Sequence, residues 1–130
     1  MALYIDTSAF LKLVVQEPES AALRKHILKA KTQIVSSDLL RTEALRTARR
    51  HSSNALLHTR ALLDGVAFIT LTADVCERAA ELDPSILRSL DALHLASALL
   101  LADDLDGVLT YDARLAEACG AHGVAVLAPR

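Results

Sequence analysis

Short apolar runs alternate with amphipathic helical segments along almost the whole chain. The expected strands are residues 3–5, 33–36, 66–71, 108–111 and 124–127. This alternation is the βαβ pattern, which predicts a parallel sheet covered by helices on both faces. Because the chain has 130 residues and no linker or low-complexity tract, we expect one doubly wound α/β domain spanning 1–130. The segment 89–102 is apolar nearly all round and should be its most buried helix.

Composition narrows the class of protein. Hydrophobic residues make up 52% of the chain but aromatic residues only 3%, so the core must be built mainly from Leu, Ala, Val and Ile. No apolar stretch approaches the ~20 residues of a membrane span, and the first residues lack the basic region of a signal peptide. Cys76 and Cys119 lie far apart with no metal-binding spacing, so we expect reduced, buried thiols in a cytoplasmic protein. The net charge of −2 argues against a general polyanion binder.

Two acidic residues directly follow expected strands. Asp6 ends the run 3–5, and Asp112 ends the run 108–111. Because parallel strands end at one edge of a sheet, both carboxylates should emerge where α/β folds bind their ligands. Either residue alone could simply be a helix N-cap. Two such acids in one small domain favour a functional role for the pair.

Two further acids lie within expected helices. Glu43 belongs to an arginine-rich helix, and its spacing alone favours a solvated residue that pairs along the helix surface. Asp91 lies in the first turn of an otherwise apolar helix, where an unpaired buried carboxylate would be costly. We therefore infer a metal or a catalytic partner for Asp91. His94 could join it as a ligand, although a lone histidine here is more simply a hydrogen-bonded core residue.

Converging carboxylates would need a cation between them. Two of them ~4 Å apart repel by about 4 kcal/mol at an effective dielectric constant of about 20. Hard carboxylate oxygens suit Mg²⁺ or Mn²⁺. The segment 41–60 concentrates positive charge, including Arg46, Arg49 and Arg50. A solvated helix face is the default interpretation, but beside an acidic metal site these arginines would suit a phosphate backbone.

Four fragments of the chain, in their order and spacing, resemble the PIN-domain nucleases and most closely the VapC toxins of type II toxin–antitoxin pairs. The fragments are residues 4–9, 43–46, 87–96 and 110–115. The resemblance covers essentially the whole chain and implies a three-layer α/β/α sandwich with a central parallel sheet of about five strands. It also implies metal-dependent cleavage of RNA, a homodimer, and a VapB-type antitoxin whose tail covers the active site.

The resemblance also assigns roles to individual residues. By motif match, the catalytic and metal-binding acids are Asp6, Glu43, Asp91 and Asp112. Thr110 matches a position that often holds a hydroxyl directed toward these acids, and Ser8 is a second supporting hydroxyl. Some relatives carry one more acid where this chain has Ala116, which weakens the case for a second metal site made of protein ligands alone.

Two alternative functions fit the predicted fold. A receiver-like phosphoacceptor should have an acid pair after its first strand and a late lysine, but this chain has Asp6-Thr7-Ser8 and no lysine after Lys31. A catalytically silent PIN-fold module, binding RNA or protein, would keep the sheet and lose acids, whereas all four are present. The sequence therefore predicts a Mg²⁺- or Mn²⁺-dependent endoribonuclease that acts as a toxin.

Overall fold

The strands of the protein form one sheet with β1 at its centre. The computed structural model describes residues 1–130. Its strands are β1 (Ala2–Ile5), β2 (Gln33–Ser37), β3 (Ala67–Ile69), β4 (Leu105–Leu109) and β5 (Val126–Leu127). Their order is β3-β2-β1-β4-β5, and every neighbouring pair is parallel. The chain winds outward from β1 in one direction and later returns to continue in the other, so the winding reverses between β1 and β4, where open α/β sheets form their crevice.

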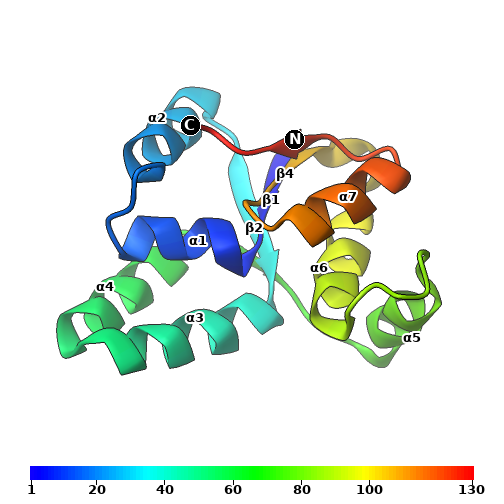
Figure 1. Ribbon diagram of the computed structural model, residues 1–130, viewed down its shortest axis with the longest axis horizontal. Helices are drawn as coiled ribbons and strands as arrows, with labels where there is room; N and C mark the ends of the chain where they lie inside the picture. The colour runs from blue at the N-terminus through cyan, green and yellow to red at the C-terminus, as the bar shows by residue number, and fades with distance from the viewer.

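Helices cover both faces of this sheet. One group contains α1 (Thr7–Val14), α2 (Ser20–Ala30), α3 (Asp38–His51) and α4 (Ser53–Leu63). The other contains α5 (Ala73–Glu81), α6 (Ser89–Leu99) and α7 (Ala113–Ala121). Figure 1 shows the first group on one side of the strands and the second on the other. This arrangement confirms the predicted three-layer sandwich.

The residues of β1 explain why the core has two halves. Leu3 and Ile5 point to one face and pack with Phe10 of α1, whereas Tyr4 points to the other face and packs with Leu95 of α6. All four residues of β1 are buried. A central parallel strand is covered on both faces, so its sequence is continuously apolar rather than alternating.

Helix α6 is the most deeply embedded helix, as predicted. Six of its eleven residues are buried, and it packs against α5, α7 and the sheet. This burial fixes the helix and so fixes the positions of Asp91 and His94, which both belong to it. No helix in the structure is long and apolar enough to cross a bilayer.

Two expectations drawn from the sequence were wrong. The strand expected at 108–111 is β4 (Leu105–Leu109), which begins and ends earlier in the chain. Gly107 therefore lies inside the strand, opposite Leu3, where a Cβ would come within 3.2 Å of the Ala125 carbonyl oxygen and of the Leu127 side chain. Cys76 is exposed rather than buried. It is the residue after Val75, which with Ala79 makes the core contact of α5.

Candidate active site

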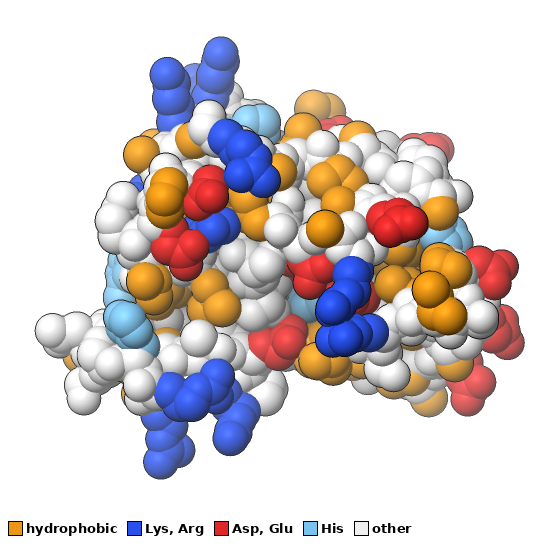
Figure 2. Space-filling view, viewed as in Figure 1, with side chains coloured by type: hydrophobic (Ala, Val, Ile, Leu, Met, Phe, Trp, Pro, Cys, Tyr) orange, Lys and Arg blue, Asp and Glu red, His pale blue; other side chains and the backbone are white.

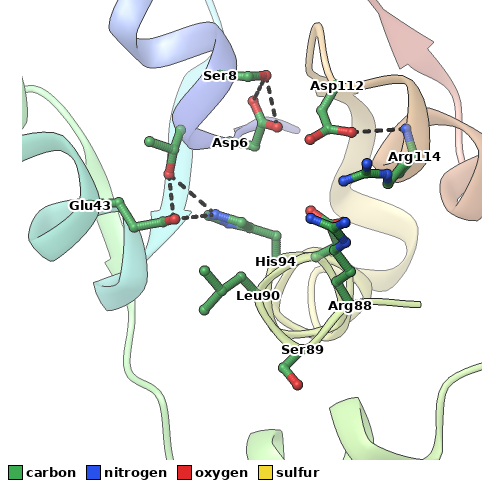
Figure 3. Close-up of a pocket in the computed structure, with 11 residues that line it drawn as sticks. Asp6, Ser8, Glu43, Arg88, Ser89, Leu90, His94, Asp112 and Arg114 are labelled. Carbon is green, nitrogen blue, oxygen red and sulfur yellow. Dashed lines mark hydrogen bonds and ion pairs between the residues drawn. The ribbon is translucent and has the colours of Figure 1, made fainter. Parts of the chain in front are cut away.

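A cavity of about 310 Å³ lies at the carboxyl edge of the sheet, and all four predicted acids line it. Its lining residues are Asp6, Thr7, Ser8, Glu43, Arg88, Ser89, Leu90, Asp91, His94, Asp112 and Arg114. Figure 3 shows Asp6 after β1, Glu43 of α3, His94 of α6 and Asp112 of the β4–α7 turn directed toward a common space. The fold therefore brings together acids that lie up to 106 residues apart in the sequence.

Asp6 is the most constrained of the four acids. It is 4% exposed and caps α1, with Oδ1 accepting from the Ala9 amide at 2.9 Å. The Ser8 hydroxyl donates to Oδ1 at 2.8 Å, and the Thr110 hydroxyl donates to Oδ2 at 2.6 Å. Burial raises the pKa of Asp6, although these hydrogen bonds oppose the shift. Its carboxylate is held in one orientation without any ligand.

Ser8 and Thr110 also connect Asp6 to the turn that carries Asp112. The Tyr111 amide donates to Ser8 Oγ at 3.0 Å, and the Asp112 amide donates to Thr110 Oγ1 at 3.0 Å. Each hydroxyl thus accepts from the backbone, which leaves its own proton for Asp6. The hydroxyl that the sequence placed at Thr110 does lie toward the acids, although the side chain is buried behind the cavity rather than lining it.

Asp112 resembles Asp6 in being both a helix cap and a lining residue of the cavity. Its Oδ1 accepts from the Arg114 amide at 2.8 Å and from the Leu115 amide at 3.3 Å, at the start of α7. The other oxygen has no protein donor. The capping role that sequence alone allowed for both strand-end acids is therefore real, and it coexists with their place in the cavity.

Asp91 differs from these two acids because no protein group donates a hydrogen bond to it. It lies in the first turn of α6 and is partly buried. Burial raises the pKa of Asp91, and the negative charge of Asp112 raises it further. An acid held beside other acids without donors is destabilised unless water or a cation solvates it.

Glu43 is not the solvated residue that its helical spacing favoured. Its Oε1 accepts from the Thr7 hydroxyl at 2.6 Å and from His94 Nε2 at 3.1 Å. Burial acts to raise the pKa of Glu43, but the hydrogen bonds from His94 and Thr7 outweigh it and leave the pKa lowered. The carboxylate is therefore kept ionised at the wall of the cavity, with Oε2 free.

His94 is the hydrogen-bonded core histidine that the sequence suggested. It is 4% exposed, and its Nδ1 lies 2.8 Å from the hydroxyl of Tyr4, which is fully buried. Burial raises the pKa of Tyr4 to about 12, so the phenol keeps its proton. The carboxylate of Glu43 can only accept a hydrogen bond, so Nε2 of His94 carries a proton and donates to Oε1. In the neutral ring Nδ1 then accepts from the Tyr4 hydroxyl.

The donors of the cavity fit a hard divalent cation in an open site. No three His, Cys, Asp or Glu side chains are close enough to enclose one ion together. Mg²⁺ seldom needs such a cage, because it is usually held by one or two carboxylates while water and substrate phosphates complete its coordination. The carboxylate of Asp91, which has no protein donor, and the fixed carboxylate of Asp6 are suited to that form of binding.

The structure separates the predicted arginines from this cavity. Arg46, Arg49 and Arg50 are exposed on α3 and do not line it. Arg88 and Arg114, which the sequence analysis did not single out, do line it. The available signal was their position: Arg88 precedes the first residue of α6, and Arg114 is two residues after Asp112.

Comparison with known proteins agrees with this architecture. The profile of the PIN domain matches residues 3–121. Ribonuclease VapC46 of Mycobacterium tuberculosis is 41% identical over 128 residues, which cover 98% of each chain. Ribonuclease VapC47 of the same species is 37% identical over 98% of this chain and 96% of its own. A chain of a toxin–antitoxin complex from Klebsiella pneumoniae superposes with a TM-score of 0.71 at 25% identity, over 100% of this chain and 98% of that one. The chain belongs to the PIN-domain family and, within it, to the VapC group.

Proposed function

We propose that this protein is a metal-dependent endoribonuclease that acts in the cytoplasm as the toxin of a toxin–antitoxin pair. The observation that carries the proposal is the convergence of four carboxylates, from four separate segments, in one cavity at the edge of the sheet. Relatives covering nearly the whole chain are ribonucleases by name. A catalytically silent module would have no reason to keep such a cluster, because mutual repulsion destabilises it.

The four acids would have different roles in binding a metal ion. Asp6 and Asp91 would hold Mg²⁺ or Mn²⁺, and Asp112 and Glu43 would complete the acidic wall. When bound, such an ion supplies Lewis acidity to a phosphodiester and lowers the pKa of a coordinated water. The hydroxyls of Ser8 and Thr110 keep Asp6 oriented.

Glu43 would be positioned by a chain of hydrogen bonds that begins in the core. Tyr4 contacts Nδ1 of His94, and His94 with Thr7 occupies Oε1 of Glu43. Only Oε2 then remains to act toward the cavity. Because the pKa of Glu43 is lowered, this oxygen carries negative charge at neutral pH and can accept a proton or a hydrogen bond from a water near the ion.

The direct test is cleavage of RNA by the purified protein. We expect new RNA ends with Mg²⁺ or Mn²⁺ and none with EDTA. Asp91→Asn should cleave at least ~100-fold more slowly, since loss of even an outer partner of a metal ligand commonly costs 10–100-fold. Asp106→Asn is the matched control, because Asp106 is exposed at the start of β4 and outside the cavity. Equal cleavage by wild type and Asp91→Asn would refute the proposal.

The toxin role requires control by a partner, and a VapB-type antitoxin is the proposed one. A separate cavity of about 230 Å³ between α1 and α3 is lined by Leu11, Val14, Val15 and Ala48 together with Arg50 and two other polar residues. These apolar side chains would suit an antitoxin segment or the seam of a homodimer. Expression of the protein alone should arrest growth, and co-expression with its genomic neighbour should relieve the arrest. Normal growth at high expression of the protein alone would contradict the toxin role even if RNA were cleaved in vitro.

A further inference from the structure

A second cavity of about 270 Å³ opens beside the acidic one, and the two share the side chains of Arg88 and Arg114. It lies between the loop that precedes α6 and one side of α7. The loop contributes Pro84, Ile86 and Leu87, and α7 contributes Ala118 one turn after Arg114. The shared arginines make the two cavities one continuous surface.

The two cavities, which meet at Arg88 and Arg114, differ in the charge and polarity of their lining residues. Four carboxylates and the two arginines line the first cavity, whereas only Glu117 opposes the arginines in the second. The second cavity also has an apolar wall, and Ile86 at its edge is 88% exposed. Figure 2 shows cationic side chains over α6 and α7 between acidic side chains and an apolar patch. Pro84, Ile86 and Leu87 together form an apolar wall directly beside the two arginines.

Both guanidinium groups are free to bind a ligand. Neither forms an ion pair with any carboxylate within 4.0 Å, although four acids line the same cavity. In Figure 3 the two side chains lie next to each other, on the side of the cavity away from Glu43. Two adjacent guanidinium groups whose N–H donors are not used in ion pairs suit phosphate oxygens, which accept bidentate hydrogen bonds from arginine.

We propose that the second cavity is a subsite for one nucleotide of single-stranded RNA adjoining the cleaved bond. Arg88 and Arg114 bind the neighbouring phosphate, and the base rests against Ile86 and Leu87. This inference rests on the proposed ribonuclease function. Single-stranded RNA is bound by positive charge along its backbone and by side chains, including arginine, against which unstacked bases pack. Along the surface, the acidic site for the cleaved bond is followed by the two arginines and then by the apolar wall, as binding of single-stranded RNA would require.

The test measures RNA binding in EDTA, so that it does not depend on cleavage. The probe is a fluorescent pool of single-stranded hexaribonucleotides, and binding is followed by anisotropy. Arg88→Gln and Arg114→Gln should each weaken binding about tenfold, the effect of losing a charge-assisted hydrogen bond. Each should also reduce the slope of log affinity against log salt by about 0.7. Arg24→Gln, which alters an exposed arginine on α2, should change neither quantity.

A second variant separates the base from the phosphate. Ile86→Ser should weaken binding of hexaribonucleotides about fivefold, as expected for loss of one base contact, and leave the salt slope unchanged. It should have no effect on a hexamer whose bases have been removed. Because Ile86 is exposed, this change should not disturb the fold, which circular dichroism can verify for every variant.

The outcomes separate the two proposals. If RNA is cleaved but the Arg88, Arg114 and Ile86 variants bind hexamers as wild type does, or if wild type binds none, the subsite is overturned. Normal RNA binding by these variants with loss of antitoxin binding would make the second cavity a protein site and would overturn it as well. If the variants lose RNA binding but wild type never cleaves RNA, the proposed function fails and the nucleotide site stands.

Discussion

The two walls of the acidic cavity hold their carboxylates in different ways. On the strand-end wall, Asp6 and Asp112 accept hydrogen bonds from backbone amides, and Asp6 also accepts from Ser8 and Thr110. On the α6 wall, Asp91 accepts none. Burial raises the pKa of both Asp6 and Asp91, but only Asp6 has protein donors that oppose the shift. The first wall is organised before a ligand arrives, whereas Asp91 depends on water or a cation.

The largest expected effect is stabilisation of the protein by the metal ion. Mn²⁺ at a hundredfold excess over its Kd should raise the free energy of unfolding by about 2.7 kcal/mol. Asp6→Asn and Asp91→Asn should reduce this gain, since each removes a proposed ligand, and Asp106→Asn should not. Urea unfolding of each protein with and without Mn²⁺ measures this gain in the free energy of unfolding. Identical gains in all four proteins would mean that the two walls do not share an ion.

The next prediction concerns the hydroxyls of the strand-end wall and whether metal binding or cleavage depends on them. Thr110→Val keeps the shape of a buried side chain but removes the proton donor to Asp6 and the acceptor of the Asp112 amide. We expect a 10–100-fold loss of metal affinity or cleavage rate, as for other partners of metal ligands. Thr70→Val, at an exposed position near the end of β3, is the control. A Thr110 variant as active as the control would show that this wall does not need its hydroxyls.

The contrast between the walls also predicts opposite changes in the metal-free protein. Asp91→Asn should stabilise it by up to about 1 kcal/mol, a small value because water screens this partly exposed group. Asp6→Asn should instead destabilise it, because an amide nitrogen would face hydroxyls that now donate to the carboxylate. We expect this loss of hydrogen bonds from Ser8 and Thr110 to outweigh the cost of burying the charge that the raised pKa of Asp6 reflects. Repulsion considered alone would predict a gain at Asp6 too. Thermal unfolding in EDTA distinguishes the two results.

The pH dependence of stability in EDTA gives a check on the same contrast. The pKa of Asp91 is raised above 3.8 in the folded state, so the folded protein binds this proton more tightly than the unfolded chain. The cost of Asp91 is therefore full above the raised pKa and disappears as pH falls toward 3.8. The pKa of Glu43 is lowered, so the ionised Glu43 stabilises the folded protein above pH 4.5. This stabilisation is lost as pH falls below 4.5. Asp91→Asn should stabilise the protein at neutral pH and lose that advantage near pH 4.

The smallest expected effect concerns the arginines of α3. Arg46, Arg49 and Arg50 are exposed and outside the acidic cavity, so any phosphate they bind lies farther from the cleaved bond. Replacing all three with Gln should flatten the salt dependence of RNA binding. Cleavage at saturating RNA should change less than it does in Asp91→Asn. An unchanged salt slope would show that these arginines are only a solvated surface.

Much of the fold was predictable because it depends on local patterns. The alternation of apolar runs with helical periodicity predicted the parallel sheet, and the apolar character of 89–102 predicted the burial of α6. The register of the strands was less accessible. The strand expected at 108–111 left Gly107 outside it, and only the structure shows Gly107 within β4, where an added Cβ would crowd the Ala125 carbonyl oxygen and the Leu127 side chain.

Some features of the candidate site were also predictable from local sequence, and others were not. The sequence placed Asp6 and Asp112 at one edge of the sheet, since strands in a parallel sheet end there. Asp6 does directly follow β1, whereas Asp112 lies three residues after the end of β4, in the turn before α7. The hydrogen bond between Glu43 and His94 spans 51 residues, and the one between Tyr4 and His94 spans 90. No periodicity in the sequence encodes such pairs.

The sequence by itself determined the kinds of element and the acids that end or interrupt them, because hydrophobic period and capping act over a few residues. The tertiary structure decided which side chains share the cavity. It placed Arg88 and Arg114 at its edge, left the arginines of α3 outside, and gave Glu43 its partners. The reason is physical: hydrogen bonds and charge interactions depend on distance in space, and packing of α3, α6 and α7 against one sheet sets those distances.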